Sequence, residues 1–186
     1  MKKVFAVILL AASLYSAMAQ TNNTHSSQKK RKITTAMGDK APLFSLAGTW
    51  TLKAAEVILP DGTHITDPGL GKDAKGILMV DADGQYSLQI FRPDRPKFVS
   101  GDKKRGTPEE YESALLGLST HVGHIKIDTA NKLLQFDIDY AAFPNWNRTT
   151  QIRQFTLKGD ELYYQLPATA GAGTIAASIW TRVKFK

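Results

Sequence analysis

Three polar side chains are expected on strand faces that are otherwise apolar, where a buried charge could do chemistry. Arg92 ends a segment in which every second residue is apolar, and Gln151 and Arg153 begin another. Alternate residues of a strand share one face, so all three side chains should point to the apolar side. A buried guanidinium is costly unless an anion satisfies it. The pattern therefore indicates a site for an anionic group.

Four more residues complete the candidate ligand-binding set. Glu56 follows the apolar face of its strand, so two partners for the arginines remain open: Glu56 itself or a carboxylate on a ligand. Both could hold in turn, since an arginine fork can bind two partners. Tyr140 and Trp146 are expected to orient a ligand, and Gln89 is the last member of the set.

Catalytic and metal-binding patterns are not visible in the chain. His121 and His124 stand three residues apart, which on a strand places them on opposite faces. No Gly-x-Ser-x-Gly elbow and no phosphate-binding glycine loop occurs. We therefore expect no catalytic residue, no bound metal and no cofactor. Glu56 and Tyr140 are the only acid–base candidates that an enzyme could use.

The elements that must position these residues are strands joined by links of alternating length. Eight strands are expected, at residues 48–58, 76–80, 85–92, 121–128, 132–142, 150–157, 161–166 and 174–185. Tight-turn residues fill the links 81–84, 129–131 and 158–160, whereas the links 60–74, 93–120, 143–149 and 167–173 are long. Alternate links of an antiparallel meander lie at opposite ends. The sequence therefore predicts an all-β, eight-stranded, antiparallel up-and-down barrel with a closed base and an elaborated mouth.

One helix interrupts the strand pattern, between the third and fourth strands. Thr107, Pro108 and Glu110 form a capping-box pattern, and apolar residues then recur at helical spacing. This position places the helix at the mouth. Two arrangements remain open: a lid over the opening, or a helix packed on the outer wall.

The N-terminal segment is expected to lie outside the fold. Residues 1–19 combine two lysines, an apolar run and Ala17-Met18-Ala19, which is typical of a secretory signal peptide. Residues 20–42 form a polar linker with five basic residues and one acidic residue, and residues 43–186 form the barrel domain with 17 basic and 16 acidic residues. The formal charge of +7 thus reflects the segment before the barrel. We expect a disordered, solvated linker and no nucleic-acid partner, although its basic cluster could touch an anionic surface.

The chain resembles the bacterial and fungal lipocalin-like domain family across nearly all of residues 44–183. The resemblance is carried by Gly48-Thr-Trp50, Leu59-Pro-Asp-Gly62, the segment 89–96, Gly106 to Tyr111, Phe143-Pro-Asn-Trp146 and Gln151 to Phe155. It implies an eight-stranded barrel with an apolar cavity. It also implies that Arg182 packs across Trp50 to shut the base, as in lipocalins proper.

Three functions are weighed on these grounds. We favour an exported protein, periplasmic or secreted, that binds a small hydrophobic and anionic ligand in the lumen, with Arg92 and Arg153 meeting its polar head. One alternative is a cyclase, isomerase or hydrolase that uses the same lumen. The other is a barrel packed shut by its own side chains, which acts as a protein-interaction module. No integral membrane segment is expected in the mature chain, because the apolar run of the signal peptide is too short to span a bilayer and no second hydrophobic stretch follows it. The absence of cysteine excludes disulfides.

Overall fold

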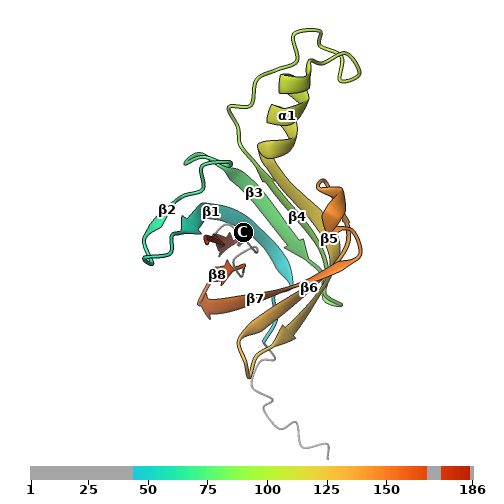
Figure 1. Cartoon of the computed structure of the whole chain (residues 1–186). Coiled ribbons are helices and arrows are strands. Elements are labelled where there is room, and N and C mark those ends of the chain that lie inside the picture. The colour runs from blue at the N-terminus through green and yellow to red at the C-terminus, as the bar shows by residue number, and fades with distance from the viewer. Residues whose placement is uncertain (1–43, 167–172, 185–186) are drawn as a thin grey trace, which may run out of the picture. The chain divides into compact units, whose positions relative to one another are not determined.

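Eight antiparallel strands close into a barrel in the computed structural model, which describes residues 44–166 and 173–184 (Figure 1). The barrel strands are β1 (Gly48–Ile58), β3 (Lys75–Val80), β4 (Gln85–Phe91), β5 (Leu118–Asp128), β6 (Leu133–Ala141), β7 (Thr149–Lys158), β8 (Glu161–Gln165) and β9 (Ile175–Arg182). Each pairs with the next, and β1 pairs with β9 to close the ring. The predicted fold is therefore confirmed. A short strand that the sequence did not reveal, β2 (His64–Thr66), pairs with the end of β1.

The two ends of the barrel differ as the link lengths predicted. Tight turns join β3 to β4, β5 to β6 and β7 to β8 at the base. At the other end, long links join β1 to β3, β4 to β5 and β6 to β7. These mouth links contain the helix α1 (Pro108–Leu116) and the 3-10 helix η1 (Pro144–Trp146). Because α1 connects β4 to β5, it lies between the third and fourth barrel strands, as expected.

The base is closed by packed aromatic residues. Trp50 is fully buried, and its indole Nε1 donates to the carbonyl oxygen of Leu46 at 2.9 Å. The guanidinium carbon of Arg182 lies 4.0 Å from the centre of the Trp50 ring, and its nitrogens donate to the carbonyl oxygens of Ala47 and Ser45. The closure implied by the family resemblance is thus present. Side chains fill this half of the barrel.

Two β-bulges reverse the direction of side chains toward the mouth. The pairing of β1 with β9 shifts between Leu52 and Ala54, so Ala55 faces the core and Glu56 faces outward. A second shift inserts an extra residue in β6 opposite Val122 and Gly123. A Cβ on Gly123 would lie 2.0 Å from the carbonyl oxygen of Asp137, so only glycine allows this close approach. One extra residue exchanges the two faces of a strand from that point on.

The helix stands beyond the rim of the barrel (Figure 1). Its capping box is present: the Thr107 hydroxyl accepts from the backbone N–H of Glu110, and the Glu110 carboxylate accepts from the N–H of Thr107. None of its residues is buried. The last turn of the helix reaches the opening, where Leu116 lines the mouth cavity, and the rest of the helix extends away from the barrel.

The predicted signal peptide and linker lie outside the described residues. None of the helices in the described part of the chain is long and apolar enough to cross a bilayer.

Candidate functional site

A cavity of about 340 Å³ occupies the mouth half of the lumen. Most of its wall is aliphatic, and the residues of that kind are Ala55, Val57, Leu70, Leu88, Ile90, Leu116, Leu118, Leu166, Ala176 and Ala177. The polar side chains in the wall include Arg153, His121, Tyr164 and Ser178. An apolar chamber with a few convergent polar groups is the usual form of a small-molecule site.

Arg153, on β7, is the charged side chain most deeply set in this wall. Only 2% of its surface is exposed. Its guanidinium carbon lies 3.8 Å from the centre of the Phe136 ring and 5.0 Å from that of Tyr164, so aromatic faces hold the cation. One terminal nitrogen donates to Gln151 Oε1 at 2.7 Å and approaches His121 Nε2 at 3.2 Å.

The guanidinium of Arg153 is nevertheless incompletely satisfied. Its Nε is buried without a hydrogen-bond partner, and no carboxylate of the described residues forms an ion pair with it. Burial lowers the pKa of this guanidinium from its ordinary value. An arginine still keeps its charge inside proteins. The wall thus contains a buried cation that has spare donor capacity.

His121, on β5, is neutral and held at both ring nitrogens. Burial, with a smaller contribution from the Arg153 charge, lowers the pKa of His121 to about 3. Arginine can only donate, so His121 Nε2 accepts from Arg153, and the ring proton is then on Nδ1. Nδ1 lies 2.7 Å from the hydroxyl oxygen of Tyr86 and donates to it. The chain Arg153–His121–Tyr86 therefore fixes the tautomer and the ring plane.

Tyr164 and Ser178 bring hydroxyl groups to the same wall. Tyr164 is 1% exposed and packs beneath Arg153, and burial raises the pKa of its phenol. Ser178, on the neighbouring β9, is also buried, and the buried Trp180 Nε1 has no partner. Sequence reasoning missed Tyr164, Ser178 and the role of His121. Strand alternation could have found two of them, because Tyr164 and His121 occupy inward positions of their strands.

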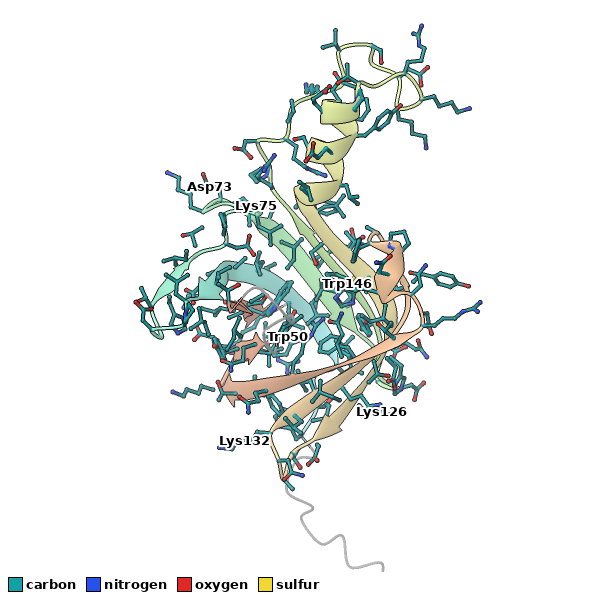
Figure 2. The ribbon with its side chains drawn as sticks, viewed as in Figure 1. Trp50, Asp73, Lys75, Lys126, Lys132 and Trp146 are labelled. Atoms are coloured by element: carbon teal, nitrogen blue, oxygen red, sulfur yellow. The ribbon has the colours of Figure 1, made fainter. Side chains whose placement is uncertain are left out.

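The structure brings together three of the seven residues that the sequence predicted. Arg153 and Trp146 line the cavity, and Gln151 bonds directly to Arg153. The Trp146 ring lies edge-on to His121, with 6.1 Å between the ring centres. Figure 2 shows Trp146 nearer the mouth and Trp50 within the barrel. The described residues thus place a guanidinium, an imidazole and an indole around one wall.

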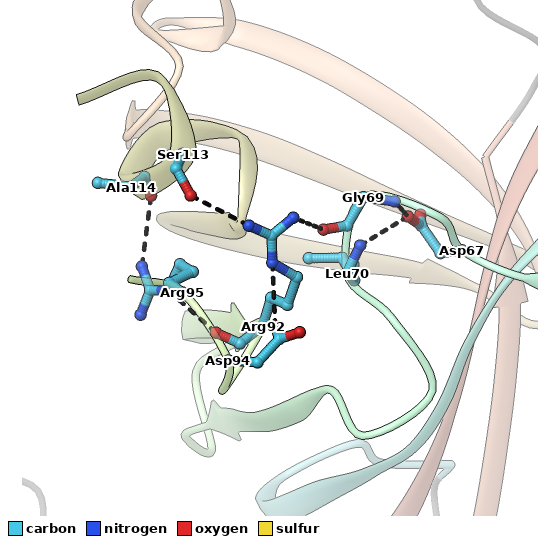
Figure 3. Close-up of polar contacts among 8 residues, drawn as sticks. All are labelled: Asp67, Gly69, Leu70, Arg92, Asp94, Arg95, Ser113 and Ala114. Atoms are coloured by element: carbon cyan, nitrogen blue, oxygen red, sulfur yellow. Dashed lines mark hydrogen bonds and ion pairs between the residues drawn. The ribbon is translucent and has the colours of Figure 1, made fainter. Parts of the chain in front are cut away.

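Arg92 does not reach the cavity and instead clamps the mouth links together (Figure 3). Its terminal nitrogens donate to the Gly69 carbonyl at 3.3 Å and to the Ser113 hydroxyl at 3.1 Å. Its Nε lies 3.1 Å from Asp94 Oδ1. The predicted lumen position was wrong because β4 ends at Phe91, so Arg92 belongs to the loop and turns toward α1.

Three other predicted residues face away from the lumen. Glu56 lies after the β1 bulge, and its carboxylate is 2.8 Å from His64 Nδ1, so the expected pair with a lumen arginine does not form. Tyr140 lies after the β6 bulge and is 65% exposed. Gln89 alternates with the buried Leu88 and donates to the Ser87 hydroxyl on the outer face. In both bulged strands, pairing with a neighbour overrode simple alternation.

The two histidines that invited a metal interpretation lie apart, as expected. His121 points into the lumen, whereas His124 contacts the Asp83 carbonyl on the other face. Among the described residues, no group of three or more histidine, cysteine or acidic side chains could hold a metal ion.

Comparison with known proteins gives a family match and distant structural similarities. A sequence model of the lipocalin-like domain family matches residues 47–183. Among solved structures, a lipocalin-like protein from Bacteroides uniformis is 16% identical, with a TM-score of 0.38, and covers 74% of this chain and 98% of its own. An uncharacterized protein from Bacteroides eggerthii is 12% identical, with a TM-score of 0.38, and covers 75% and 100%.

A third solved structure is that of a fatty acid transporter named REP1-NXSQ. It is 16% identical to this chain, with a TM-score of 0.34, and covers 76% of this chain and 98% of its own. No curated protein matches the chain.

Proposed function

The chain belongs to the lipocalin-like domain family, and from that premise we propose that it is an exported protein which binds a small hydrophobic anion in the barrel lumen. The single observation that carries this proposal is the guanidinium of Arg153. It is buried in the wall of an aliphatic cavity, with an unsatisfied Nε and no carboxylate partner among the described residues. A ligand carboxylate would supply the missing acceptor and the missing charge.

The position of Arg153 also defines how such a ligand would lie. The guanidinium is stacked on Phe136 and Tyr164, below the aliphatic residues that surround the opening. A ligand would therefore enter with its anionic head first. Its apolar tail would lie against Ile90, Leu116 and Leu118, on the mouth side.

Binding is better supported than catalysis in this lumen. An acid–base enzyme needs a group with an available proton or lone pair near the substrate. His121 has neither, because Arg153 occupies Nε2 and Tyr86 occupies Nδ1. The earlier acid–base candidates, Glu56 and Tyr140, face outward. A barrel packed shut is less well supported, because packing fills only the base half and leaves the cavity above it.

Export is supported by the sequence pattern of residues 1–19. Lys2 and Lys3, the apolar run 4–14 and Ala17-Met18-Ala19 follow the order of a signal peptide. Mass measurement of the N-terminus of the protein recovered from its native host tests this part. A chain that begins at Gln20 is expected, and a chain that keeps Lys2 would contradict export by this route.

The test of binding uses three probes that share one tail: dodecanoic acid, dodecanol and dodecylamine. Each is titrated calorimetrically into delipidated protein. We expect the acid to bind wild-type protein most tightly and to lose about 10- to 100-fold in affinity with Arg153→Met, the range for one charged hydrogen bond. The alcohol should lose little. Equal affinities for acid and alcohol, or an unchanged affinity for the acid in Arg153→Met, would contradict the proposal.

Arg92→Met is the matched control. Arg92 is also an arginine near the mouth, but it does not line the cavity. Its substitution should leave the affinity for dodecanoic acid within about twofold of wild type. A loss equal to that of Arg153→Met would mean that the net charge of the protein, and not a contact with Arg153, determines the affinity. Mass spectrometry of an organic extract from natively purified wild-type and Arg153→Met protein then identifies the natural ligand class.

A further inference from the structure

Residues 93–116, which we call the mouth arm, stand beyond the barrel rim (Figure 1). The arm consists of the loop 93–107 and helix α1. It is tied to the barrel at its near end, where Arg92 bonds to Ser113, and Arg95 bonds to the carbonyl oxygens of Arg92 and Ala114. Beyond these contacts, α1 buries none of its residues.

The far end of the arm is nevertheless built to a defined shape. The Glu110 carboxylate accepts from the backbone N–H groups of Val99 and Thr107, at 2.7 and 2.8 Å. The Tyr111 hydroxyl accepts from the N–H of Gly106, and its ring lies edge-on to Phe98, with 5.3 Å between the ring centres. One helix side chain therefore fixes the backbone at the tip of the loop. The loop tip is therefore an ordered surface, held by hydrogen bonds from its backbone to helix side chains.

This surface presents apolar side chains to water. Val99 is 97% exposed, although its own backbone is held by Glu110. Leu116 is 62% exposed, and Tyr111 and Leu115 are also exposed on the helix. Val99 is the most exposed of the large apolar side chains in the described residues, and several exposed apolar side chains on one arm point to a surface that meets a partner.

The charges beside Val99 are basic. Lys97, Lys103 and Lys104 are exposed, and none of them forms an ion pair with another described residue. Arg105 is bonded to Asp102 within the loop. The acidic residues Glu109 and Glu112 are on the helix, so an anionic partner would be met by the loop tip and not by the helix flank.

We propose that the tip of the mouth arm docks on an anionic lipid bilayer. Val99 enters the interface between headgroups and acyl chains, while Lys97, Lys103 and Lys104 bind lipid phosphates. The aliphatic side chain suits the apolar interior of such a bilayer, and the lysines around it suit its anionic headgroup layer. The inference does not depend on the lumen ligand, because none of these four residues lines the cavity.

The first experiment uses the absence of cysteine from the chain. Val99→Cys in the mature chain gives a single site for the environment-sensitive fluorophore NBD, and Asn131→Cys gives a matched site in a base turn. Vesicles contain either phosphatidylcholine alone or phosphatidylcholine with 30% phosphatidylglycerol. We expect NBD at position 99 to brighten and shift to the blue with the anionic vesicles only, and NBD at position 131 to stay unchanged.

Two outcomes would overturn the proposal. Vesicle binding without a change at position 99 would show that another segment, such as the basic residues 29–32, makes the contact. No change in NBD fluorescence at position 99 with either vesicle would mean that the tip does not bind lipid and that its partner is of another kind, such as a protein. Because Val99 is almost fully exposed, the labelled variant should fold as wild type does.

A second experiment tests the charges. Lys103→Gln/Lys104→Gln should weaken partitioning of the mature chain to the anionic vesicles by about 30-fold, because each lysine contributes roughly fivefold. The matched pair Lys132→Gln/Lys158→Gln removes two exposed base lysines and should have little effect. Equal losses in the two pairs would attribute binding to net charge and overturn docking by the arm.

Discussion

Two arginines stack on aromatic rings at opposite ends of this barrel, and they are satisfied in different ways. Arg182 lies 4.0 Å from the ring centre of Trp50 at the base, and both of its terminal nitrogens donate to backbone carbonyl oxygens. Arg153 lies 3.8 Å from the ring centre of Phe136 at the cavity, and its Nε has no partner. The terminal nitrogens of Arg182 thus have protein acceptors, whereas Arg153 keeps a buried donor without an acceptor.

The difference shows how one type of contact serves two purposes. An arginine over an aromatic ring gains stability wherever it occurs, but only a buried and unsatisfied donor favours the arrival of an anion. The base arginine has backbone acceptors that the fold always supplies. The cavity arginine has an imidazole and an amide, which are neutral. No carboxylate of the described residues forms an ion pair with the cavity arginine, since Asp67, which also lines the cavity, accepts from the backbone N–H groups of Gly69 and Leu70.

Trp50→Ala should give the largest effect, because it removes the centre of the packed base. A fully buried tryptophan replaced by alanine leaves a cavity, so we expect the free energy of unfolding to fall by about 3–5 kcal/mol. Urea unfolding followed by far-ultraviolet circular dichroism measures it. Trp146→Ala, at the mouth, serves as the control and should cost less than half as much, and equal losses would erase the contrast between the two ends.

Replacing each arginine by methionine tests the comparison directly. Arg182→Met should lower the free energy of unfolding by about 2 kcal/mol, since charged hydrogen bonds and a cation–π contact are lost. Arg153→Met should leave it unchanged or raise it, because a buried charge without a counter-charge is removed. Chemical unfolding of both variants without ligand is the measurement. A stability loss for Arg153→Met equal to that for Arg182→Met would make Arg153 a structural residue.

The pH dependence of stability should report on His121. Its pKa is about 3 in the folded protein, against an ordinary value of 6.5, because it is buried beside Arg153. Below pH 6.5 the unfolded chain binds a proton that the folded protein does not, so stability is lost as the pH falls. Between pH 6.5 and pH 5 the free energy of unfolding should therefore fall by about 1.5 kcal/mol through His121.

The loss of stability between these two pH values is measured from the unfolding midpoints of the wild type, His121→Gln and His124→Gln. His121→Gln should reduce it, whereas His124→Gln, on the opposite strand face, should retain it. An unchanged pH dependence in His121→Gln would mean that the imidazole at the cavity is not held neutral.

Thr107→Ala should give the smallest effect, confined to the mouth arm. The hydroxyl of Thr107 caps α1, and loss of a cap costs about 1 kcal/mol. Because α1 buries no residue, its amides should exchange hydrogen faster while global unfolding stays the same. Hydrogen exchange resolved by residue tests this. A matching fall in global stability would show that the arm and the barrel unfold together.

Much of the fold could be predicted from the local sequence. The turn Asp81 to Gly84 and the capping residues at Thr107 and Glu110 act on their immediate neighbours, and all of them form as predicted. Strand ends were less accurate, since β5 begins at Leu118 and β2 was missed. These boundaries depend on which strand lies alongside, and the local sequence does not contain that information.

Among the predicted site residues on strands, alternation identified lumen-facing side chains only where the strand remains regular. Arg153 and Gln151 are on β7, which pairs with both neighbours without a bulge, and alternation placed them correctly. Tyr140 and Glu56 follow bulges in β6 and β1, and alternation placed them on the wrong face. Gly123, a glycine inside a strand, was the one local sign of the bulge beside it.

Turn chemistry and strand alternation act over a few residues, and they were enough to predict the eight barrel strands and the two kinds of link. The contact of Arg182 with Trp50 at the base was implied by the family resemblance. Which polar groups meet at the cavity depends on contacts between residues far apart in the chain, and local patterns did not reveal them. Arg153 bonds to His121 across 32 positions, and Arg92 was drawn to Ser113 across 21. Such contacts depend on strand register, and a single inserted residue reverses every side chain that follows it.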